Sequence, residues 1–304
     1  MVVEDLEVFL SDKVKRESLS VVLLDCNVGQ EDLFISEKEK KERLSVVLDE
    51  VTSLIRERKP LYDRWSQNKG EKQRVLSVPK KQLKEFLSSY VLGLIKQAVP
   101  HKRCHGGEIG WSVKRSLETH LPCKCAISFD LESAFLNLRE NLVYEFFYSL
   151  LNASLSSSER SNISRFLSLL CTVDYKGERG LPQGSPCSMA LFNRALYNLD
   201  ELLENGARSR GFKYSRWIDD MTISSSSGEK IERFLGAVEL TNNRLPVSKE
   251  KLFFQDGERI YLLGHKVGRQ VVKNSKQEKL ENKSSPLNFD EIFSSKRKCY
   301  ESWN

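Results

Sequence analysis

Trp217-Ile218-Asp219-Asp220 is the stretch that most constrains the structure of this 304-residue chain. Its two adjacent acids lie inside an otherwise apolar, β-branched and aromatic run, with Gly211 before it and a cluster of serines after it. Such a run predicts a β-hairpin with a tight turn at or next to the acids. Two carboxylates held at one turn repel each other unless a cation lies between them. Taken alone, such a pair is more often a solvated turn, so the interpretation depends on a further acid.

That further acid is Asp130. Residues 125–129 form a short apolar run that ends on it, which predicts a buried strand with a carboxylate at its C-terminal end. Residues 139–151 then carry apolar side chains at positions that indicate a helix. Hard oxygen ligands suit Mg²⁺, and two such ions about 3.5–4 Å apart can hold both oxygens of a phosphoryl transfer. A strand ending in Asp130, followed by a hairpin carrying Asp219 and Asp220, is typical of a polymerase palm.

A third block, Leu181-Pro182-Gln183-Gly184-Ser185-Pro186, precedes a stretch from 189 to 203 that we expect to be helical. With this block the chain resembles a reverse transcriptase of the prokaryotic retroelement group, which includes retrons, group II intron proteins and defence-associated enzymes. Asn193 and Leu199-Asp200 follow as they do in retron enzymes. Residues 214–220 stand at the place of the family's Tyr-x-Asp-Asp box.

The resemblance covers roughly residues 68–268. Further segments that match the family are Lys72 to Pro79 in the fingers, His105 to Ser112 ahead of the first catalytic strand, Ser248 to Lys251, and Tyr261 to Gly264 as a closing strand. The chain also departs from the family, because Trp217 replaces a usual Tyr and Ile218 replaces a small residue. These departures leave the three acids untouched.

The resemblance implies an α+β fold, namely a right-hand polymerase palm and fingers with helices packed on an antiparallel palm sheet. We expect a helical N-terminal extension (1–60), fingers and palm (61–268), and a basic tail (269–304). In the extension, a helix from Ser36 to Arg58 should be capped by Ser36, with Glu39 as the capping-box partner. The tail would be a short or incomplete thumb, or a flexible segment.

The resemblance also assigns the metal ligands. Asp130 and Asp219 would be the principal ligands of two Mg²⁺ ions, for which Mn²⁺ can substitute. Asp220 and the backbone carbonyl of Leu131 would complete the set. These three acids would be the catalytic residues.

A second group of residues would bind the nucleotide. Its members are Lys72, Arg74, Phe135, Gln183, Gly184 and Lys251. Lys72 and Arg74 would contact the phosphates, and Lys251 would approach the leaving group. Phe135 falls where the family has an aromatic gate against the ribose 2′-hydroxyl, although ordinary core packing is the alternative for this ring.

The implied function is RNA-directed DNA polymerase activity, which makes cDNA in a bacterial retron or antiviral defence system. Its partners would be dNTPs, an RNA template, a nucleic-acid primer and a dedicated structured non-coding RNA. Two alternatives stay open: a template-independent or protein-primed DNA polymerase, and a non-catalytic RNA-binding or maturase-like module. The three acids argue against the module. A protein partner or an oligomer is also compatible with the sequence.

Composition agrees with these expectations. The net charge is +6 and the pI is near 8.8, and basic residues concentrate between Arg56 and Lys84, where contact with phosphates is favoured. No stretch approaches the ~20 apolar residues of a membrane span, and the N-terminus lacks the pattern of a signal peptide. We therefore expect a cytoplasmic protein without a membrane partner, with its seven cysteines reduced.

One cluster of possible zinc ligands needs a separate assessment. It consists of His101, Cys104, His105, His120, Cys123 and Cys125. The spacing matches no standard zinc finger, so the family's His-Gly turn and the apolar strand are the favoured explanations of these residues.

Overall fold

The computed structural model describes residues 2–25, 36–69, 72–151, 155–227, 235–242, 245–257, 260–267 and 272–274. The chain divides into two compact units, each of which combines two separate segments. Unit 1 contains residues 1–99 and 135–195, and unit 2 contains residues 100–134 and 196–304. The division at residues 60 and 268 that the sequence suggested stays a prediction. Among the described residues, no helix has the length and apolar character that a membrane crossing requires.

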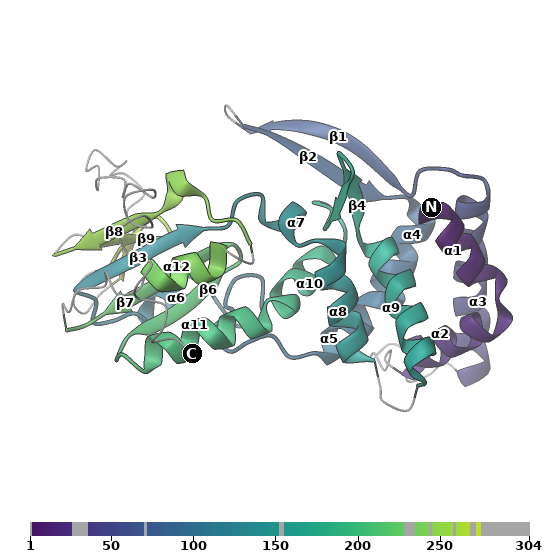
Figure 1. The fold of residues 1–304 in the computed structure, drawn as a ribbon, viewed down its shortest axis with the longest axis horizontal. Helices are drawn as coiled ribbons and strands as arrows, with labels where there is room; N and C mark the ends of the chain where they lie inside the picture. Colours follow the sequence, from purple (N-terminus) through teal and green to yellow (C-terminus); the bar gives the residue numbers. More distant parts are fainter. Residues whose placement is uncertain are drawn as a thin grey trace. The chain divides into compact units, whose positions relative to one another are not determined.

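Unit 1 is mainly helical, and its N-terminal region is helical as predicted. The helices are α1 (Val2–Ser11), α2 (Lys13–Asp25), α3 (Glu37–Arg56), α4 (Lys81–Phe86), the π-helical turn η2 (Leu87–Val91), α5 (Leu92–Gln97), α7 (Ala134–Asn137), α8 (Glu140–Leu150), α9 (Ser157–Cys171) and α10 (Ser188–Ala195). Ser36 caps α3 and forms the predicted capping box with Glu39. Helices α1 and α2 pack on α9 (Figure 1), where the rings of Phe9 and Phe166 stack with centroids 4.3 Å apart.

Two β-hairpins complete unit 1. β1 (Tyr62–Lys69) and β2 (Lys72–Pro79) pair in antiparallel register along their full length, and β2 coincides with the segment that the sequence assigned to the fingers. β4 (Val173–Tyr175) and β5 (Glu178–Gly180) form the second hairpin. The Ser77 N–H of β2 donates to the Gln183 carbonyl over 2.8 Å, so that β2 is fastened to the loop that precedes α10.

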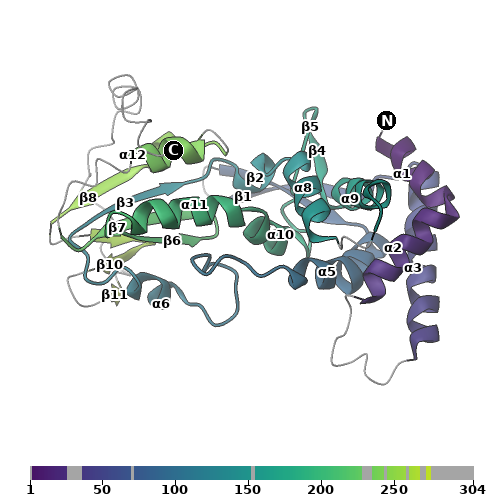
Figure 2. The ribbon, with the colours of Figure 1, turned by 60° about the horizontal axis from the view of Figure 1, so that its bottom comes forward.

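Unit 2 contains a four-stranded antiparallel sheet in the order β6-β7-β3-β8 (Figure 2). The strands are β6 (Lys213–Trp217), β7 (Asp220–Ser225), β3 (Cys125–Asp130) and β8 (Phe253–Asp256). Helix α11 (Tyr197–Arg208) runs alongside β6 in both views (Figures 1 and 2) and contacts it. The remaining described elements are α6 (Val113–Glu118), α12 (Leu235–Asn242), η4 (Lys249–Lys251), β9 (Ile260–Leu262), β10 (His265–Val267) and β11 (Val272–Asn274).

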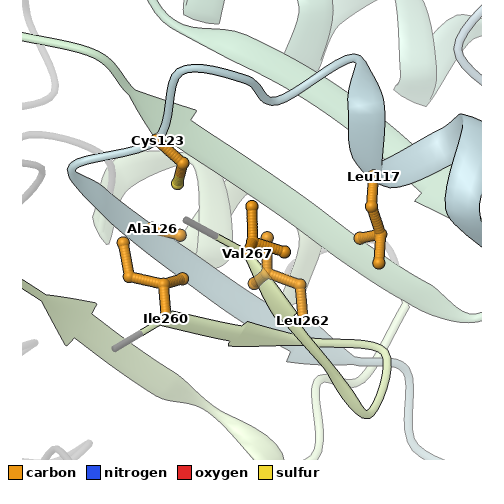
Figure 3. Close-up of a cluster of buried hydrophobic side chains, with 6 residues drawn as sticks. All are labelled: Leu117, Cys123, Ala126, Ile260, Leu262 and Val267. Carbon is orange, nitrogen blue, oxygen red and sulfur yellow. The ribbon is translucent and has the colours of Figure 1, made fainter. Parts of the chain in front are cut away.

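Strands β9, β10 and β11 form a three-stranded sheet in the order β11-β10-β9. A small apolar cluster joins this sheet and α6 to the four-stranded sheet (Figure 3). Its buried members are Leu117, Cys123, Ala126, Ile260, Leu262 and Val267. The β9–β10 hairpin supplies three of them, and its two turn residues, Leu263 and Gly264, both have positive φ, as two-residue hairpin turns often require. The predicted closing strand is thus present as β9, and its apolar side chains pack against β3.

The stretch from 189 to 203 is helical as expected except at Leu196, where it divides into two helices. Helix α10 ends at Ala195 and α11 begins at Tyr197, with Leu196 between them at φ −87° and ψ 5°. The division between the two units falls at the same place, so residues on either side pack into different cores. No Gly or Pro lies at the break between the two helices. We therefore attribute the break to tertiary packing rather than to local helix propensity.

Of the predicted tail, 269–304, only Val272–Asn274 is described, as strand β11 paired with β10. The rest of the predicted tail lies outside the described residues. The six residues weighed as zinc ligands do not gather, within the described part of the chain, into a group of three metal-ligating side chains. His101 lies instead beside two glutamates of α11.

His120 is a buried crosslink within unit 2. Its Nδ1 lies 2.7 Å from the Ser224 Oγ of β7, and its Nε2 lies 2.7 Å from the Ser215 Oγ of β6. The side chain is fully buried, and burial lowers the pKa of the imidazole to about 3 from the ordinary 6.5. The neutral ring therefore bridges two neighbouring strands.

We expect His120 to make unit 2 sensitive to acid. Between pH 6.5 and about 3 the unfolded chain binds a proton at His120 that the folded chain does not, so the free energy of unfolding falls as the pH falls. In His120→Gln, which keeps donor and acceptor groups, this contribution of up to about 1.4 kcal/mol per pH unit is absent. Urea unfolding of both proteins from pH 7 to pH 4 measures the free energy of unfolding at each pH. The same pH dependence in the native protein and the variant would contradict a neutral, buried His120.

Candidate metal centre

The predicted hairpin is present and brings three carboxylates to one end of the four-stranded sheet. β3 and β7 pair so that Asp130 stands opposite Asp220, and β6 pairs Trp217 with Asp220. Residues directly opposite each other in an antiparallel pair face the same side of the sheet. Ile218 and Asp219 form the two-residue turn between β6 and β7. The register alone therefore places Asp130 and Asp220 side by side.

The three acids are close enough to hold a metal ion together. Each offers one carboxylate oxygen, and these oxygens lie within 4.8 Å of one another. Burial and the neighbouring carboxylates raise the pKa of Asp219, and they raise the pKa of Asp220 to about 7. The ionised carboxylates thus repel one another, and a divalent cation bound between them would compensate this repulsion. An all-oxygen donor set suits a hard cation such as Mg²⁺ or Mn²⁺, so the residues fit the metal that the sequence predicted.

Lys251 lies at the same place. Its Nζ, carried by η4, donates to Oδ2 of Asp130. Burial opposes the ammonium charge, but the hydrogen bond and charge of Asp130 outweigh it and raise the pKa of Lys251. The Ser248 N–H donates to the Asp130 carbonyl over 2.8 Å, which fixes the segment before η4 to the end of β3. Lys251 therefore lies beside the three acids, and its predicted contact with the nucleotide stays a prediction.

Leu131 follows β3 directly and is buried. Its N–H donates to the Asp219 carbonyl over 3.1 Å, so the end of β3 is tied to the hairpin turn. This bond constrains where the Leu131 peptide can lie. The ligand role of its carbonyl stays a prediction.

The other predicted nucleotide-binding residues belong to unit 1. Phe135, at the start of α7, is half-buried and stacks on Phe192 with centroids 4.9 Å apart. Its carbonyl accepts from the Leu181 N–H over 2.9 Å, so the ring and the loop carrying Gln183 and Gly184 are linked. A Cβ added at Gly184, which has φ +118°, would lie 2.9 Å from Val78 Cγ2 of β2. Glycine is therefore required where this loop meets β2.

The two basic candidates lie on β2. Arg74 is exposed and pairs with Gln67 of β1. Lys72 is the first residue of β2 and pairs with Lys69, and its side chain is outside the described part of the structure. The fingers hairpin thus carries both positions, and their contact with phosphates stays a prediction.

A second group of metal-ligating side chains is already neutralised. His101, Glu201 and Glu204 also have ligand atoms within 4.8 Å of one another. However, Glu204 pairs with Lys102 Nζ at 3.1 Å and with Arg103 Nε at 2.8 Å. Two cations thus already compensate the charge of Glu204, so we take the Asp130 group as the candidate metal centre.

Sequence reasoning missed two residues beside this centre. Asp200 and Arg216 were quoted as parts of family motifs without a role, yet both are fully buried and paired with each other. A charged residue in a short strand was the only signal in the sequence, and it did not name its partner.

Comparison with known proteins agrees with the fold. Residues 66–267 match the family model described as reverse transcriptase (RNA-dependent DNA polymerase). Retron Ec86 reverse transcriptase of Escherichia coli is 28% identical over 167 residues, which cover 54% of this chain and 49% of that protein. Retron Mx65 reverse transcriptase of Myxococcus xanthus is 28% identical over 189 residues, 59% of this chain and 44% of that protein. The chain thus spans about half the length of these relatives or less.

Solved telomerase structures share the fold. Apo telomerase from Candida tropicalis, truncated from the C-terminal domain, matches with a TM-score of 0.52 and 15% identity, over 70% of this chain and 54% of that one. Telomerase from the same organism in complex with a fragment of telomeric RNA matches with a TM-score of 0.51 and 16% identity, over 77% and 47%. At such identity the likeness concerns the fold alone, a palm and fingers with an antiparallel sheet.

We expect a divalent ion to stabilise the protein through the three acids. Mg²⁺ should raise the melting temperature of the native chain, and Asp219→Asn/Asp220→Asn should abolish that increase. Without metal the double variant should be more stable by about 1–2 kcal/mol, because the repulsion is gone. Melting curves with and without MgCl₂ measure both effects, with Asp256→Asn in β8, opposite the first residue of β3, as control. An equal Mg²⁺ response of native protein and double variant would contradict the metal centre.

Proposed function

The chain belongs to the reverse transcriptase (RNA-dependent DNA polymerase) family, and on that basis we propose that it synthesises cDNA on an RNA template. The observation that carries this proposal is the gathering of Asp130, Asp219 and Asp220 at the end of β3. Three half-buried or buried acids that repel one another lower the stability of the folded protein. In a nucleotidyl-transfer site the same acids would serve as ligands of the metal ions.

In this proposal Asp130, Asp219 and Asp220 hold two divalent ions, with the Leu131 carbonyl as a further ligand. Such ions, when bound, lower the pKa of a primer 3′-hydroxyl and neutralise the triphosphate and the departing pyrophosphate. The protein contributes position: β3 and β7 hold the acids in register, and water is limited by the burial of Asp130. Lys251 keeps an ammonium group beside Asp130, where it stabilises negative charge on a leaving phosphate or donates a proton to it.

Residues of unit 1 would select and hold the nucleotide. Arg74 offers a bidentate fork for phosphate and Lys72 a point charge. Gln183 and Gly184 would line the site next to the template, where Gly permits a close approach of the backbone and Gln offers both donors and acceptors. Phe135 would exclude a ribose 2′-hydroxyl, which makes dNTPs the substrates.

We further propose a retron-type context. The relatives are named retron reverse transcriptases, and the similarity extends over 54–59% of this chain. The template and primer would then belong to a dedicated structured RNA, held through phosphate and shape rather than sequence. A role in antiviral defence stays a prediction from lineage.

Primer extension tests the activity directly. On a generic RNA template with a DNA primer, dNTPs and Mg²⁺, the native chain should make DNA that copies the template. Asp219→Asn/Asp220→Asn should lower the rate by at least about 10³-fold, because the charges that hold the ions are removed. Sequencing of the product and quantification on a gel measure both, and Asp256→Asn is the matched control.

Other outcomes separate the alternatives. DNA made without reference to the template, or attached to the protein, would favour a template-independent or protein-primed polymerase. RNA binding without synthesis, on any template, would favour the non-catalytic module. DNA made equally well by the double variant would overturn the assignment of the acids.

Phe135 can be tested separately as the sugar gate. Phe135→Ala should raise the incorporation of rNTPs relative to dNTPs by roughly 10-fold or more, because the clash with the 2′-hydroxyl is relieved. Phe135→Tyr, which keeps the ring and its stacking on Phe192, should retain the preference for dNTPs. Single-nucleotide incorporation with both sugar types measures the ratio. If alanine lowers stability and leaves the ratio unchanged, Phe135 is a core residue.

A further inference from the structure

The turn that carries Asp219 has a conformation that needs support. Ile218 has φ +59°, in the left-handed region that a β-branched residue rarely adopts. Such strain persists only where the surroundings hold it in place. Because Asp219 is the next residue, whatever holds Ile218 also sets the direction of the Asp219 carboxylate.

The Arg216 side chain contacts this turn. Its Nη1 donates to the Ile218 carbonyl over 2.8 Å. Its other two nitrogens form a bidentate pair with Asp200 of α11, Nε to Oδ1 at 2.8 Å and Nη2 to Oδ2 at 2.7 Å. Tyr214 also donates to Asp200 Oδ1, at 2.6 Å. The planar guanidinium thus spans from a helix on one side to the hairpin turn on the other.

Stability alone does not account for this buried pair. Arg216 and Asp200 are both fully buried, and burial opposes the charge of Arg216 although Asp200 outweighs it and raises the pKa of the guanidinium. Apolar residues of similar volume often fill such a site at no loss of stability. An apolar pair, however, has no donor for the Ile218 carbonyl. The Arg216–Asp200 pair therefore supplies a hydrogen-bond donor to the Ile218 carbonyl, which an apolar pair would lack.

The turn is also confined from a second direction. The Arg216 N–H donates to the Arg103 carbonyl and the His105 N–H donates to the Arg216 carbonyl, both over 2.8 Å. This pairing brings Gly106 so close that an added Cβ would lie 2.4 Å from the Ile218 nitrogen. The turn therefore lies between a backbone segment that tolerates only glycine and the guanidinium of Arg216.

We propose that Arg216, oriented by Asp200, is a positioning residue for the candidate metal centre. It holds the Ile218 carbonyl, and through this peptide it fixes the Asp219 carboxylate relative to Asp130. The inference rests on the proposed polymerase function for its effect on rate, and on the three acids for its effect on metal binding.

Arg216→Lys tests the proposal with the charge retained. A single ammonium can pair with Asp200 but cannot bind both carboxylate oxygens and the Ile218 carbonyl together. We expect about a 10–100-fold loss in kcat and a comparable rise in the Mg²⁺ concentration for half-maximal rate, with the KM for dNTP nearly unchanged. Tyr214→Phe is the matched control, because it removes a hydrogen bond to the same Asp200 and none to the turn. It should lower the melting temperature and leave kcat and the Mg²⁺ requirement within about two-fold.

A second variant covers the case in which Arg216→Lys does not fold. Asp200→Leu/Arg216→Met removes both charges together, so no unpaired ion is buried. It should melt near the native temperature and still show the lost rate and the raised Mg²⁺ requirement. Native kcat and native Mg²⁺ requirement in either folded variant would overturn the proposal.

A metal titration without nucleotides keeps this inference separate from the proposed function. The Mg²⁺ concentration that half-saturates the increase in melting temperature should rise about 10-fold or more in both Arg216 variants and stay native in Tyr214→Phe. If the native protein makes no DNA but both Arg216 variants still need more Mg²⁺ than the native protein and Tyr214→Phe, the polymerase proposal fails and the positioning role stands. If all variants titrate like the native protein, the positioning role fails whatever the activity.

Discussion

Repulsion among three carboxylates is the constraint on which unit 2 depends. Asp130, Asp219 and Asp220 gain nothing from one another, so the fold must hold them together against their charge. The register of β3 against β7 does this for two of them, and a slip of one residue would turn Asp220 to the opposite face. Lys251 compensates part of the charge at Asp130. A site of this kind is stable enough to fold and still favours a divalent cation, which is the balance that a metal-dependent site requires.

The same register is fixed from both faces of the sheet. On one face His120 bridges Ser215 and Ser224, which belong to neighbouring strands. Strand alternation puts Tyr214 and Arg216 on the other face, where both bond to Asp200 of α11. Buried polar networks of this kind are satisfied in one arrangement only, so they specify register more sharply than apolar packing does. The conformation of the hairpin is thus set by contacts on both faces of the sheet and does not depend on the acids alone.

Local signals were enough to predict the elements that carry the acids. The strand ending in Asp130, the hairpin around Asp219, and the Ser36 cap all depend on residues adjacent in sequence, and all are present. The break at Leu196 and the pairing of Arg216 with Asp200 were not predictable in this way. The break has no Gly or Pro to mark it, and the pair joins residues 16 apart on a helix and a strand. In both cases the cause is the tertiary core, which single-sequence patterns do not contain.

The unusual box sequence follows from the same arrangement. At the position where the family resemblance predicts a small residue, this chain has Ile218 at φ +59°, a conformation that costs energy for a branched side chain. Two features offset that cost: the hydrogen bond from Arg216 to the Ile218 carbonyl, and the absence of a Cβ at Gly106, which leaves room for the Ile218 backbone. Both Arg216 and Gly106 therefore bear on the conformation of Ile218. A departure from the family pattern at one residue of the box is thereby consistent with an intact set of acids, because the surrounding contacts, rather than the size of residue 218, set the direction of Asp219.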